Sequence, residues 1–453
     1  MPSKKQSSLE ERIRTSIEAN VPEAFKKAVK KARPADIAEA LERLAAPGRR
    51  HAFSLLDLSQ RAEVVNEFSV RVARQVLDGL SVREIAEILD RLPMDEAARI
   101  IAAFRRRRPA ILRAMDSQHA ADVRSLLRYP AESAGLMMTE QFARVRPDLT
   151  AQQALSYLRK VDADVETFTN LYVVNKQDQL IGVVSLREVV VAPPKTKLQD
   201  LMNADVISVT PETDREEVAR LISRYDFLAM PVVNAEGRML GVITADDVID
   251  VLAAENAEDL LKFGAVGSAG LAEESYFTIP IKTVISRRLG WLLLLFVAGT
   301  LTGSVLRFFE TELATVVALS FFIPLLIGTG GNTGAQTVST LIRGLATGEV
   351  QMKDIWRVIR REFISGVLLG GMLGVVAFVR AILWNPDPAL AIAVAVAIMA
   401  ICAWANTIAA LIPLLAQRFK IDPAAVSAPL ITTLVDATGL AIYLMIAKVT
   451  LGL

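Results

Sequence analysis

The sequence predicts a multidomain protein: an all-α region of helical repeats, a duplicated α/β region, an acidic connecting helix, and an all-α membrane region of five spans. Three observations predict this order. Two stretches of the chain are internally repeated, each with its own period. Five long apolar runs then follow residue 288. The expected boundaries are a polar tail over 1–20, helical repeats over 21–130, the duplicated region over 131–246, the connecting helix and its linker over 247–270, and the membrane region over 271–453.

Composition narrows the function classes. The 453 residues are 52% hydrophobic and have a formal net charge of +1, although Arg and Lys crowd the first half. Cys402 is the single cysteine, which excludes intrachain disulfides and thiolate metal clusters. His51 and His119 both precede the apolar runs, so we expect no histidine proton relay in the membrane. Residues 1–20 lack the apolar stretch of a secretory signal. The basic run 105–108 lacks interleaved aromatic residues, so no nucleic-acid partner is predicted.

The repeats define the two regions before the membrane part. Residues 37–44 resemble residues 85–92, which start 48 positions later, as expected for stacked helical hairpins that sense or bind a partner. Residues 182–188 resemble residues 241–247, 59 positions later. Each of the second pair of units reads as βαββα, with Ser185 or Thr244 as the N-cap of its last helix.

The duplicated Gly-Val-x-[Ser/Thr]-x-x-[Asp/Glu] pattern resembles tandem CBS domains. In that family these hydroxyl and acidic residues contact an adenosine nucleotide when one binds. The resemblance therefore implies nucleotide contacts, with the alternative that these residues only cap helices and pack. The implied residues are Ser185, Arg187, Glu188, Thr244 and Asp247, with Phe227 as a stacking residue.

An acidic helix follows the second unit. Asp247, Asp250 and Glu258 fall on one helical stripe, with Glu255 and Asp259 beside it, and few basic residues are near in the sequence. Like charges at this spacing repel by a few tenths of a kcal/mol per pair, roughly. Three explanations compete: a solvated face, ion pairs with the Arg-rich helical repeats, or binding of divalent cations.

The expected spans are residues 289–309, 313–341, 363–383, 389–415 and 424–447. The connections before the first span, between the second and third, and between the fourth and fifth are basic, so the positive-inside bias puts them in the cytoplasm. The N-terminal regions then lie in the cytoplasm and the C-terminus outside. The basic residues are Lys282, Arg287, Arg288, Arg343, Lys353, Arg357, Arg360, Arg361, Arg418 and Lys420.

Two spans contain polar patterns that suggest a function. Asp436 is the sole residue charged at neutral pH between Asp422 and Lys448, and a carboxylate at mid-membrane costs about 2.5–3.5 kcal/mol. It is predicted to face a bundle interior or a cation path, the alternative being a structural Asp. In the second span, Pro324 and the glycines around Asn332 predict a broken helix whose carbonyls and amides suit a hard cation, the alternative being a kink for close packing.

The whole arrangement resembles the MgtE family of bacterial magnesium channels. The motifs are Pro324…Gly330-Gly331-Asn332-Thr333-Gly334…Gln336 and Pro429…Thr432-Thr433…Asp436…Gly439. The resemblance implies a homodimer in the bacterial cytoplasmic membrane whose two-fold axis holds a Mg²⁺-selective pore. The implied pore residues are Asp436, Asn332, Thr333, Gly328, Gly331, Thr433 and Gly439.

The resemblance also implies regulation. The acidic helix matches the family's plug helix, where intracellular Mg²⁺ bound between cytoplasmic domains closes the pore, and ATP is a further ligand at the CBS domains. The implied ligands are Asp247, Asp250, Glu255, Glu258, Asp259, Glu216, Asp226, Asp95 and Asp422, besides Asp436 in the pore. The alternatives are a CBS-regulated secondary transporter for another divalent cation and a nucleotide-sensing membrane protein without transport. An enzyme is not expected, because no nucleophile–base constellation or phosphate loop is present.

Overall fold

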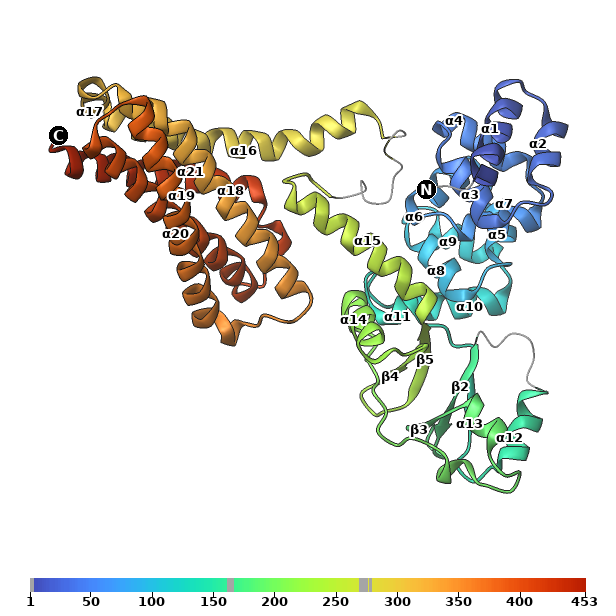
Figure 1. The fold of residues 1–453 in the computed structure, drawn as a ribbon. Coiled ribbons are helices and arrows are strands. Elements are labelled where there is room, and N and C mark those ends of the chain that lie inside the picture. The colour runs from blue at the N-terminus through green and yellow to red at the C-terminus, as the bar shows by residue number, and fades with distance from the viewer. Residues whose placement is uncertain (1–3, 161–166, 269–275, 277–278) are drawn as a thin grey trace. The chain divides into compact units, whose positions relative to one another are not determined.

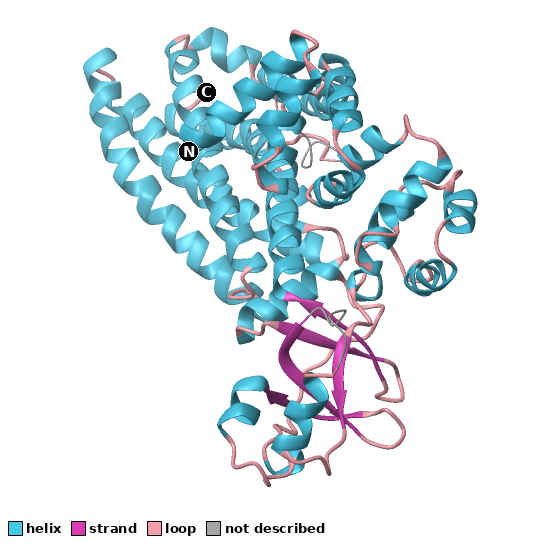
Figure 2. Cartoon of the chain, turned by 90° about the vertical axis from the view of Figure 1, so that its right-hand side faces the viewer, coloured by secondary structure: helices cyan, strands magenta, loops and turns pink. Residues whose placement is uncertain are grey.

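The computed structural model describes residues 4–160, 167–268, 276 and 279–453. The chain forms two compact units. The first comprises Met1–Glu255 with Glu273–Ile279, and the second comprises Asn256–Ala272 with Pro280–Leu453. Among the described residues, all strands belong to the first unit, and the regular structure of the second unit is helical (Figure 2).

The first unit begins with ten short helices (Figure 1). Side-chain caps begin several of them, for example the capping boxes at Asp57 and Ser81. The first 20 residues, expected as a polar tail, instead contain a helix whose Ile13 is fully buried. The helices are α1 (Lys4–Glu18), α2 (Pro22–Val29), α3 (Pro34–Glu42), α4 (Ala46–Leu55), α5 (Leu58–Asn66), α6 (Val70–Leu77), α7 (Val82–Leu89), α8 (Met94–Ala102), α9 (Arg108–Ala114) and α10 (Ser117–Leu126).

The duplicated region follows a short helix, α11 (Ala134–Met137). Its first copy has β1 (Phe142–Val145), α12 (Ala151–Leu158), β2 (Thr167–Val174), β3 (Leu180–Ser185) and α13 (Leu186–Val191). β2 pairs with β1 in parallel and with β3 antiparallel. After a 3₁₀ turn (Leu198–Asp200), the second copy has α14 (Arg215–Tyr225) and the antiparallel pair β4 (Ala229–Val233) and β5 (Met239–Thr244). Its first strand is reduced to one bridge between Val209 and Val232.

The glycine that opens each repeated motif allows another segment to pass close to the strand. A Cβ atom built on Gly182 would lie 2.5 Å from Met202 Sδ, and one built on Gly241 would lie 2.7 Å from the Thr139 carbonyl oxygen. Thr139 in turn bridges to Val242. The repeated glycine is therefore needed for packing of the two copies, whatever ligand they bind.

The two copies are not packed alike. Val218, Ile222, Met230 and Ile243 of the second copy belong to the same hydrophobic core as the ten N-terminal helices, whereas the first copy has a separate core. The sheets meet through a small cluster that includes Tyr172. The helical repeats and the second copy thus form one packed body.

The connecting helix is α15 (Ala245–Phe263), which begins in the first unit and ends in the second. It ends at Phe263, and two residues later Ala265 adopts a left-handed conformation with φ 55°. Residues 269 and 270 of the expected linker lie outside the described residues.

The second unit contains the long helices α16 (Ile281–Phe308), α18 (Ala318–Ala346), α19 (Ile355–Trp384), α20 (Pro388–Arg418) and α21 (Ala428–Leu451), with α17 (Glu310–Thr315) after the first. Short 3₁₀ turns cover Met352–Asp354 and Pro423–Ala425. Within the described residues, four helices are long and apolar enough to cross a membrane: α16, α19 with its preceding turn, α20 and α21. α18, the second expected span, is of similar length but contains the Gly-Thr-Gly-Gly-Asn-Thr-Gly stretch.

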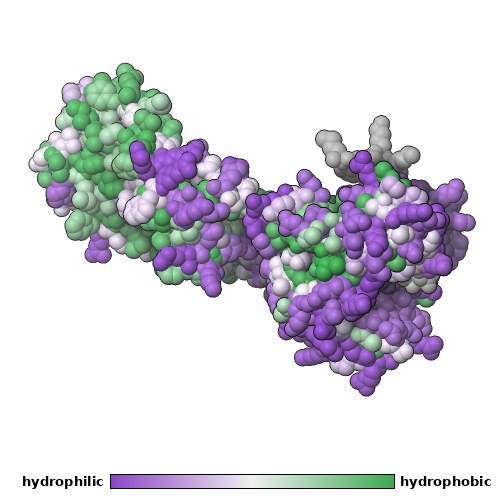
Figure 3. Space-filling model, turned by 90° about the horizontal axis from the view of Figure 1, so that it is seen from below, coloured by the Kyte–Doolittle hydropathy of each residue, from purple (hydrophilic) through white to green (hydrophobic). Residues whose placement is uncertain are grey.

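Much of the second unit's outer surface is hydrophobic (Figure 3). None of the residues of α16 is buried in the single chain, and Phe296 and Phe308 are among its exposed side chains. α19 and α20 pack backbone to backbone, because a Cβ built on Gly370 would lie 2.7 Å from Met399 Cα. An apolar exterior around a glycine-packed bundle suits a lipid environment.

Candidate metal and pore sites

Asp436 lies in the middle of α21, half-buried against α18. A Cβ built on Gly331 would lie 3.5 Å from Asp436 Oδ1, so the glycine leaves room for the carboxylate. Gly330 and Gly334 pack more closely still: Cβ atoms built on them would lie 2.5 Å from Ile401 Cγ2 and 3.1 Å from Ile431 Cγ2. The expected break in this helix is wrong, since α18 is helical throughout Ala318–Ala346. The glycines serve close packing, which was the alternative interpretation.

The pore residues predicted from the sequence separate into two groups. Gly328 and Asn332 are exposed on α18 in the single chain, and Thr433 on α21 is half-buried. Gly331, Thr333 and Gly439 are buried in the single chain, where they pack against neighbouring helices. The Thr333 hydroxyl donates to the Thr329 carbonyl and lies 3.8 Å from Cys402 Sγ. A Cβ on Gly439 would lie 3.3 Å from Ile401.

Tyr443 fixes the outer part of α21 against α18. Its hydroxyl donates to the Leu319 carbonyl at 3.0 Å, and the side chain is fully buried. The face of α21 that carries Asp436, Gly439 and Tyr443 therefore packs against α18 and α20. Gly328 and Asn332, with the exposed part of Asp436, stay open to water or to a second copy.

An acidic cluster forms in the first unit where α8 meets the start of α15. One ligand oxygen from each of Asp95, Glu96 and Asp247 lies within 4.8 Å of the others, close enough to hold a metal ion. Asp95 and Glu96 are in the first turn of α8, where the helix dipole stabilises negative charge. Asp247 also accepts a hydrogen bond from the Thr244 hydroxyl at 2.8 Å. Carboxylate oxygens in this number suit Mg²⁺ that keeps part of its water shell.

Glu67 extends this cluster. Partial burial, and then the charges of Asp250 and Glu96, raise the pKa of the Glu67 carboxyl above its ordinary value. Arg99 donates to Glu96 and to the Asn66 carbonyl, which holds Glu96 beside the end of α5. Sequence reasoning found Asp95, Asp247 and Asp250 but missed Glu96 and Glu67. The adjacent acids after Pro93 were a usable signal for Glu96, whereas Glu67 had none.

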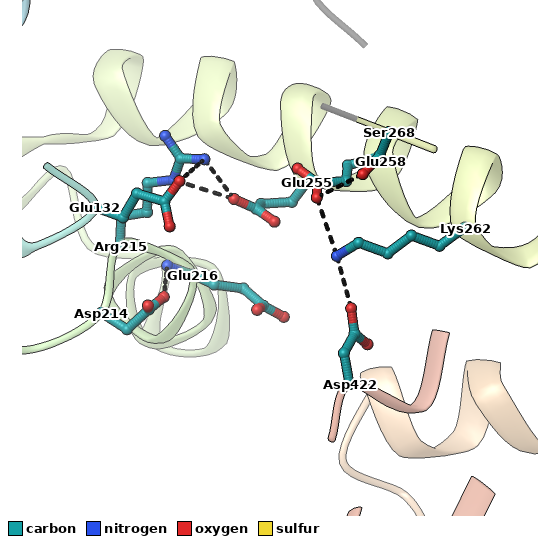
Figure 4. Close-up of polar contacts among 9 residues, drawn as sticks. All are labelled: Glu132, Asp214, Arg215, Glu216, Glu255, Glu258, Lys262, Ser268 and Asp422. Carbon is teal, nitrogen blue, oxygen red and sulfur yellow. Dashed lines mark hydrogen bonds and ion pairs between the residues drawn. The ribbon is translucent and has the colours of Figure 1, made fainter. Parts of the chain in front are cut away.

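Two further acids of α15, Glu255 and Glu258, form ion pairs with basic side chains, which is the second of the three explanations weighed for this helix, in a different form. In the first unit, Arg215 Nη2 and Nε lie 2.8 and 3.0 Å from Glu255 Oε1 (Figure 4). In the second unit, Lys262 Nζ lies 3.1 Å from Glu258 Oε1 and 2.6 Å from Asp422 Oδ2. The sequence did not predict these ion pairs, because Arg215 is distant in sequence from Glu255 and Lys262 is distant from Asp422.

Three other predicted metal ligands, Glu216, Asp226 and Asp259, differ in their exposure and in their position on a helix. Glu216 is exposed in the first turn of α14, where its backbone N–H donates to Asp214. Asp226 is exposed and ends the same helix in a left-handed conformation with φ 53°. Asp259 is half-buried on α15. Among the described residues, the group with metal-ligand spacing does not include these three.

The predicted nucleotide contacts are at the start of α13. Ser185 and Glu188 form a capping box, in which the Glu188 carboxylate accepts from the Ser185 hydroxyl at 2.8 Å and from its backbone N–H at 2.9 Å. Arg187 is exposed. Phe227 is in the second copy, stacked on Tyr225 with ring centroids 5.5 Å apart. The capping role of Ser185 and Glu188 is thus satisfied within the chain, and Arg187 is left to meet a ligand.

Comparison with known proteins identifies each region. Residues 32–132 match the MgtE intracellular N domain, residues 134–195 and 198–254 match the CBS domain, and residues 323–446 match MgtE, a divalent cation transporter family. The magnesium transporter MgtE of Thermus thermophilus is 39% identical over 451 residues, which cover 98% of this chain and 99% of that protein. This chain belongs to the MgtE family.

Other MgtE proteins match over shorter lengths. The magnesium transporter MgtE of Bacillus subtilis is 39% identical over 336 residues, or 74% of this chain and 73% of that protein. A crystal structure of the cytosolic domain of the Mg²⁺ channel MgtE in complex with ATP matches 53% of this chain and 99% of that chain, with 34% identity and a TM-score of 0.49.

Membership of MgtE, together with four helices able to cross a bilayer, makes this a membrane protein with an N-terminal MgtE domain and tandem CBS domains. The named full-length relative is a transporter, in agreement with the expectation that the chain is not an enzyme.

Proposed function

We propose that this protein is a Mg²⁺-selective channel that imports Mg²⁺ down its electrochemical gradient. The observation that carries the proposal is the Asp436 carboxylate in the middle of α21, beside the glycine-rich face of α18. A buried carboxylate in a membrane helix is costly unless it binds a cation or faces water. Mg²⁺ gives up its waters reluctantly, and a site of carboxylates with amides such as Asn332 suits the hydrated ion.

The pore would form between two copies of the chain. Gly328 and Asn332 are exposed in the single chain, and Asp436 and Thr433 are half-exposed, so these residues are available to face a second copy across a two-fold axis. The same arrangement would place two Asp436 carboxylates near one ion. By the positive-inside bias, the MgtE N domain and the CBS domains lie in the cytoplasm and the C-terminus lies outside the cytoplasmic membrane.

Transport by the full-length chain in liposomes tests the proposal. Asp436→Asn should reduce Mg²⁺ influx by at least about tenfold, which corresponds to about 1.4 kcal/mol lost from cation binding. Glu310→Gln is the matched control, because Glu310 is an exposed carboxylate between the long helices. Unitary currents with Mg²⁺ as sole cation would distinguish a channel from a carrier. Unchanged influx in Asp436→Asn would overturn the proposed role of Asp436, and no influx with the wild type would favour a sensor without transport.

We further propose that intracellular Mg²⁺ closes the channel by binding the acidic cluster on α8 and α15. Bound Mg²⁺ would neutralise Asp95, Glu96 and Asp247 and so favour the packed form over an open one, which is a population shift caused by differential binding. Replacing these three by Asn, Gln and Asn should leave the channel conducting at high internal Mg²⁺. Normal closure in that triple variant would remove this part of the proposal.

A nucleotide is proposed as a second ligand. Arg187 is exposed beside the N-terminus of α13, and an exposed guanidinium is suited to bind phosphate in a bidentate manner. Calorimetric titration of the full-length protein with ATP should give binding that Arg187→Ala weakens. Arg144→Ala, which removes an exposed Arg from the same domain, is the control. If both variants weakened ATP binding equally, the binding would depend on nonspecific electrostatic attraction.

The orientation is also testable. Cys402 is buried and is the only cysteine, so a Cys402→Ala background allows single cysteines to be introduced for labelling. A cysteine at Glu349 should be labelled from the cytoplasmic side and one at Gly452 from the outside. The reverse pattern would contradict the proposed topology.

A further inference from the structure

The end of α15 belongs to the second unit, where an ion pair attaches it to the segment that precedes α21. Lys262 Nζ lies 2.6 Å from Asp422 Oδ2 and 3.1 Å from Glu258 Oε1, so one ammonium lies between two carboxylates (Figure 4). The Lys262 side chain is only 26% exposed. The Ser268 hydroxyl also donates to Glu258 Oε1 at 3.0 Å. Glu258 and Asp422 are therefore positioned by contacts within this chain.

The next residue adds an apolar attachment. Phe263 packs against a buried cluster drawn from three long helices, including Val338 of α18, Ala405 of α20 and Val435 of α21. Beyond the turn, the Gly267 backbone N–H donates to the Arg287 carbonyl at 3.0 Å. The end of the connecting helix is thus tied to the helical bundle at three successive points.

Asp422 connects this attachment to the helix that carries Asp436. Its carboxylate accepts from the Ala424 backbone N–H at 2.9 Å and begins the 3₁₀ turn Pro423–Ala425. Ser427 then caps α21. A displacement of Lys262 would therefore act on the start of α21 through a short, hydrogen-bonded segment.

We propose that the Lys262 ammonium is a built-in cation that takes the place of a divalent ion between Glu258 and Asp422, and with Phe263 couples the connecting helix to α21. The inference rests on the proposed function, because it concerns how closure reaches the pore. A tethered cation is present at every Mg²⁺ concentration, so this contact persists when the ion is scarce. Sensing of Mg²⁺ is then left to the cluster of Asp95, Glu96 and Asp247.

The charge on Lys262 is secure at neutral pH. Burial lowers the pKa of its ammonium, but the hydrogen bonds and charges of Asp422 and Glu258 outweigh burial and raise the pKa above its ordinary value. Without that charge, two carboxylates would face each other across a part-buried site and repel. A divalent ion would then be required to hold them together.

The test uses full-length protein in liposomes prepared with a series of internal Mg²⁺ concentrations. Lys262→Met should raise the internal Mg²⁺ needed for half-closure by at least about fivefold, equivalent to about 1 kcal/mol. Lys262→Arg should stay within about twofold of wild type, because it keeps the charge. Half-closure of Lys262→Met at the wild-type Mg²⁺ concentration would overturn the proposal.

Asp422→Asn supplies a second variant if Lys262→Met does not fold. Asn caps helices as well as Asp does, so this change removes the ion pair and keeps the cap. It should shift half-closure in the same direction as Lys262→Met. A wild-type response in Asp422→Asn would also overturn the proposal.

Hydrogen exchange separates this inference from the proposed function. Without Mg²⁺, amides of residues 260–267 should exchange slowly in wild type and Lys262→Arg and at least about fivefold faster in Lys262→Met, which corresponds to about 1 kcal/mol. Equal exchange in all three would refute the built-in cation even if transport is confirmed. A loss of protection confined to Lys262→Met would support it even if Asp436→Asn transports normally and the channel proposal fails.

Discussion

Gly331 of α18 lies directly against the carboxylate of Asp436 on α21, at a distance where a methyl group would just be in van der Waals contact. The position therefore accepts Ala but no larger side chain without moving the carboxylate or Thr432 beside it. Gly331 therefore affects both the packing of α18 on α21 and the position of the Asp436 carboxylate.

We expect Gly331→Ala to keep most Mg²⁺ transport and Gly331→Leu to lose it, with a destabilisation of about 1–3 kcal/mol from overpacking. Gly299→Leu on α16 is the control, because nothing lies within 4 Å of that glycine. Transport assays and thermal unfolding check both parts. Full transport by Gly331→Leu would show that Asp436 has more room than the structure gives it.

Neighbouring glycines on α19 should respond differently to the same change. A Cβ on Gly370 would lie 2.7 Å from Met399 Cα, whereas one on Gly371 meets nothing within 4 Å. Gly370→Ala should therefore destabilise the helical bundle by about 1–3 kcal/mol. Gly371→Ala should be neutral or stabilising by up to about 1 kcal/mol, since Ala is the better helix former.

Tryptophan fluorescence is a suitable probe for this pair. All four Trp residues, at 291, 356, 384 and 404, lie in the second unit, so the signal reports unfolding of the bundle alone. Equal midpoints for the two variants would contradict the backbone contact between α19 and α20.

The ion pair of Arg215 with Glu255 should stabilise the start of the connecting helix. Both side chains are about one-quarter exposed, at 26% and 23%, and the guanidinium makes two hydrogen bonds to one oxygen. A double-mutant cycle with Ala at both positions should give a coupling of about 1 kcal/mol or more. The exposed pair of Arg220 and Glu217 is the control and should give about 0.3 kcal/mol.

Hydrogen exchange at α14 and α15 in the full-length protein would provide the free energies for this cycle. A coupling no larger than that of the control pair would show that Arg215 does not hold the helix. In that case Glu255 would be free to bind a metal ion, as the sequence alone suggested.

Domain order and element type were predictable because they depend on local pattern. The repeats at Ile37 and Ile85 and at Gly182 and Gly241 predicted helices and βαββα units, and these are found, except that the second unit has a single bridge in place of its first strand. The α1 helix was missed, because its sequence is polar except for widely spaced residues such as Ile13, and its burial depends on tertiary contacts. Local composition carries little information about such contacts.

The site was predictable only where function requires an unusual residue. Asp436 stands out because a charge in an apolar run is rare, whereas no local signal showed that Gly331 packs against its carboxylate. Glycines at Gly330 and Gly334 were expected to break α18, yet tight contacts with α20 and α21 keep the helix intact. Long-range pairing, as of Lys262 with Asp422, leaves no signal in a single sequence.

The acidic cluster predicts a pH dependence that Mg²⁺ removes. The pKa of Glu67 is raised in the folded chain by partial burial, Asp250 and Glu96. Between the unfolded value and the raised folded value, the folded form binds more protons, so stability increases as pH falls through this window and is lower above it. Without divalent ions, Glu67→Gln should therefore be more stable than wild type at neutral pH, and the two should converge as pH approaches about 4.5.

Mg²⁺ should abolish this difference, because a bound cation offsets the same repulsion that protonation relieves. Hydrogen exchange of amides in α5 and α8 would measure it, with Glu63→Gln as a control on an exposed acid of the same helix. Parallel pH profiles for wild type and Glu67→Gln would show that Glu67 does not belong to the cluster. A difference that persists in saturating Mg²⁺ would instead place the cation away from Glu67, on Asp95 and Asp247, since only those carboxylates would then be neutralised.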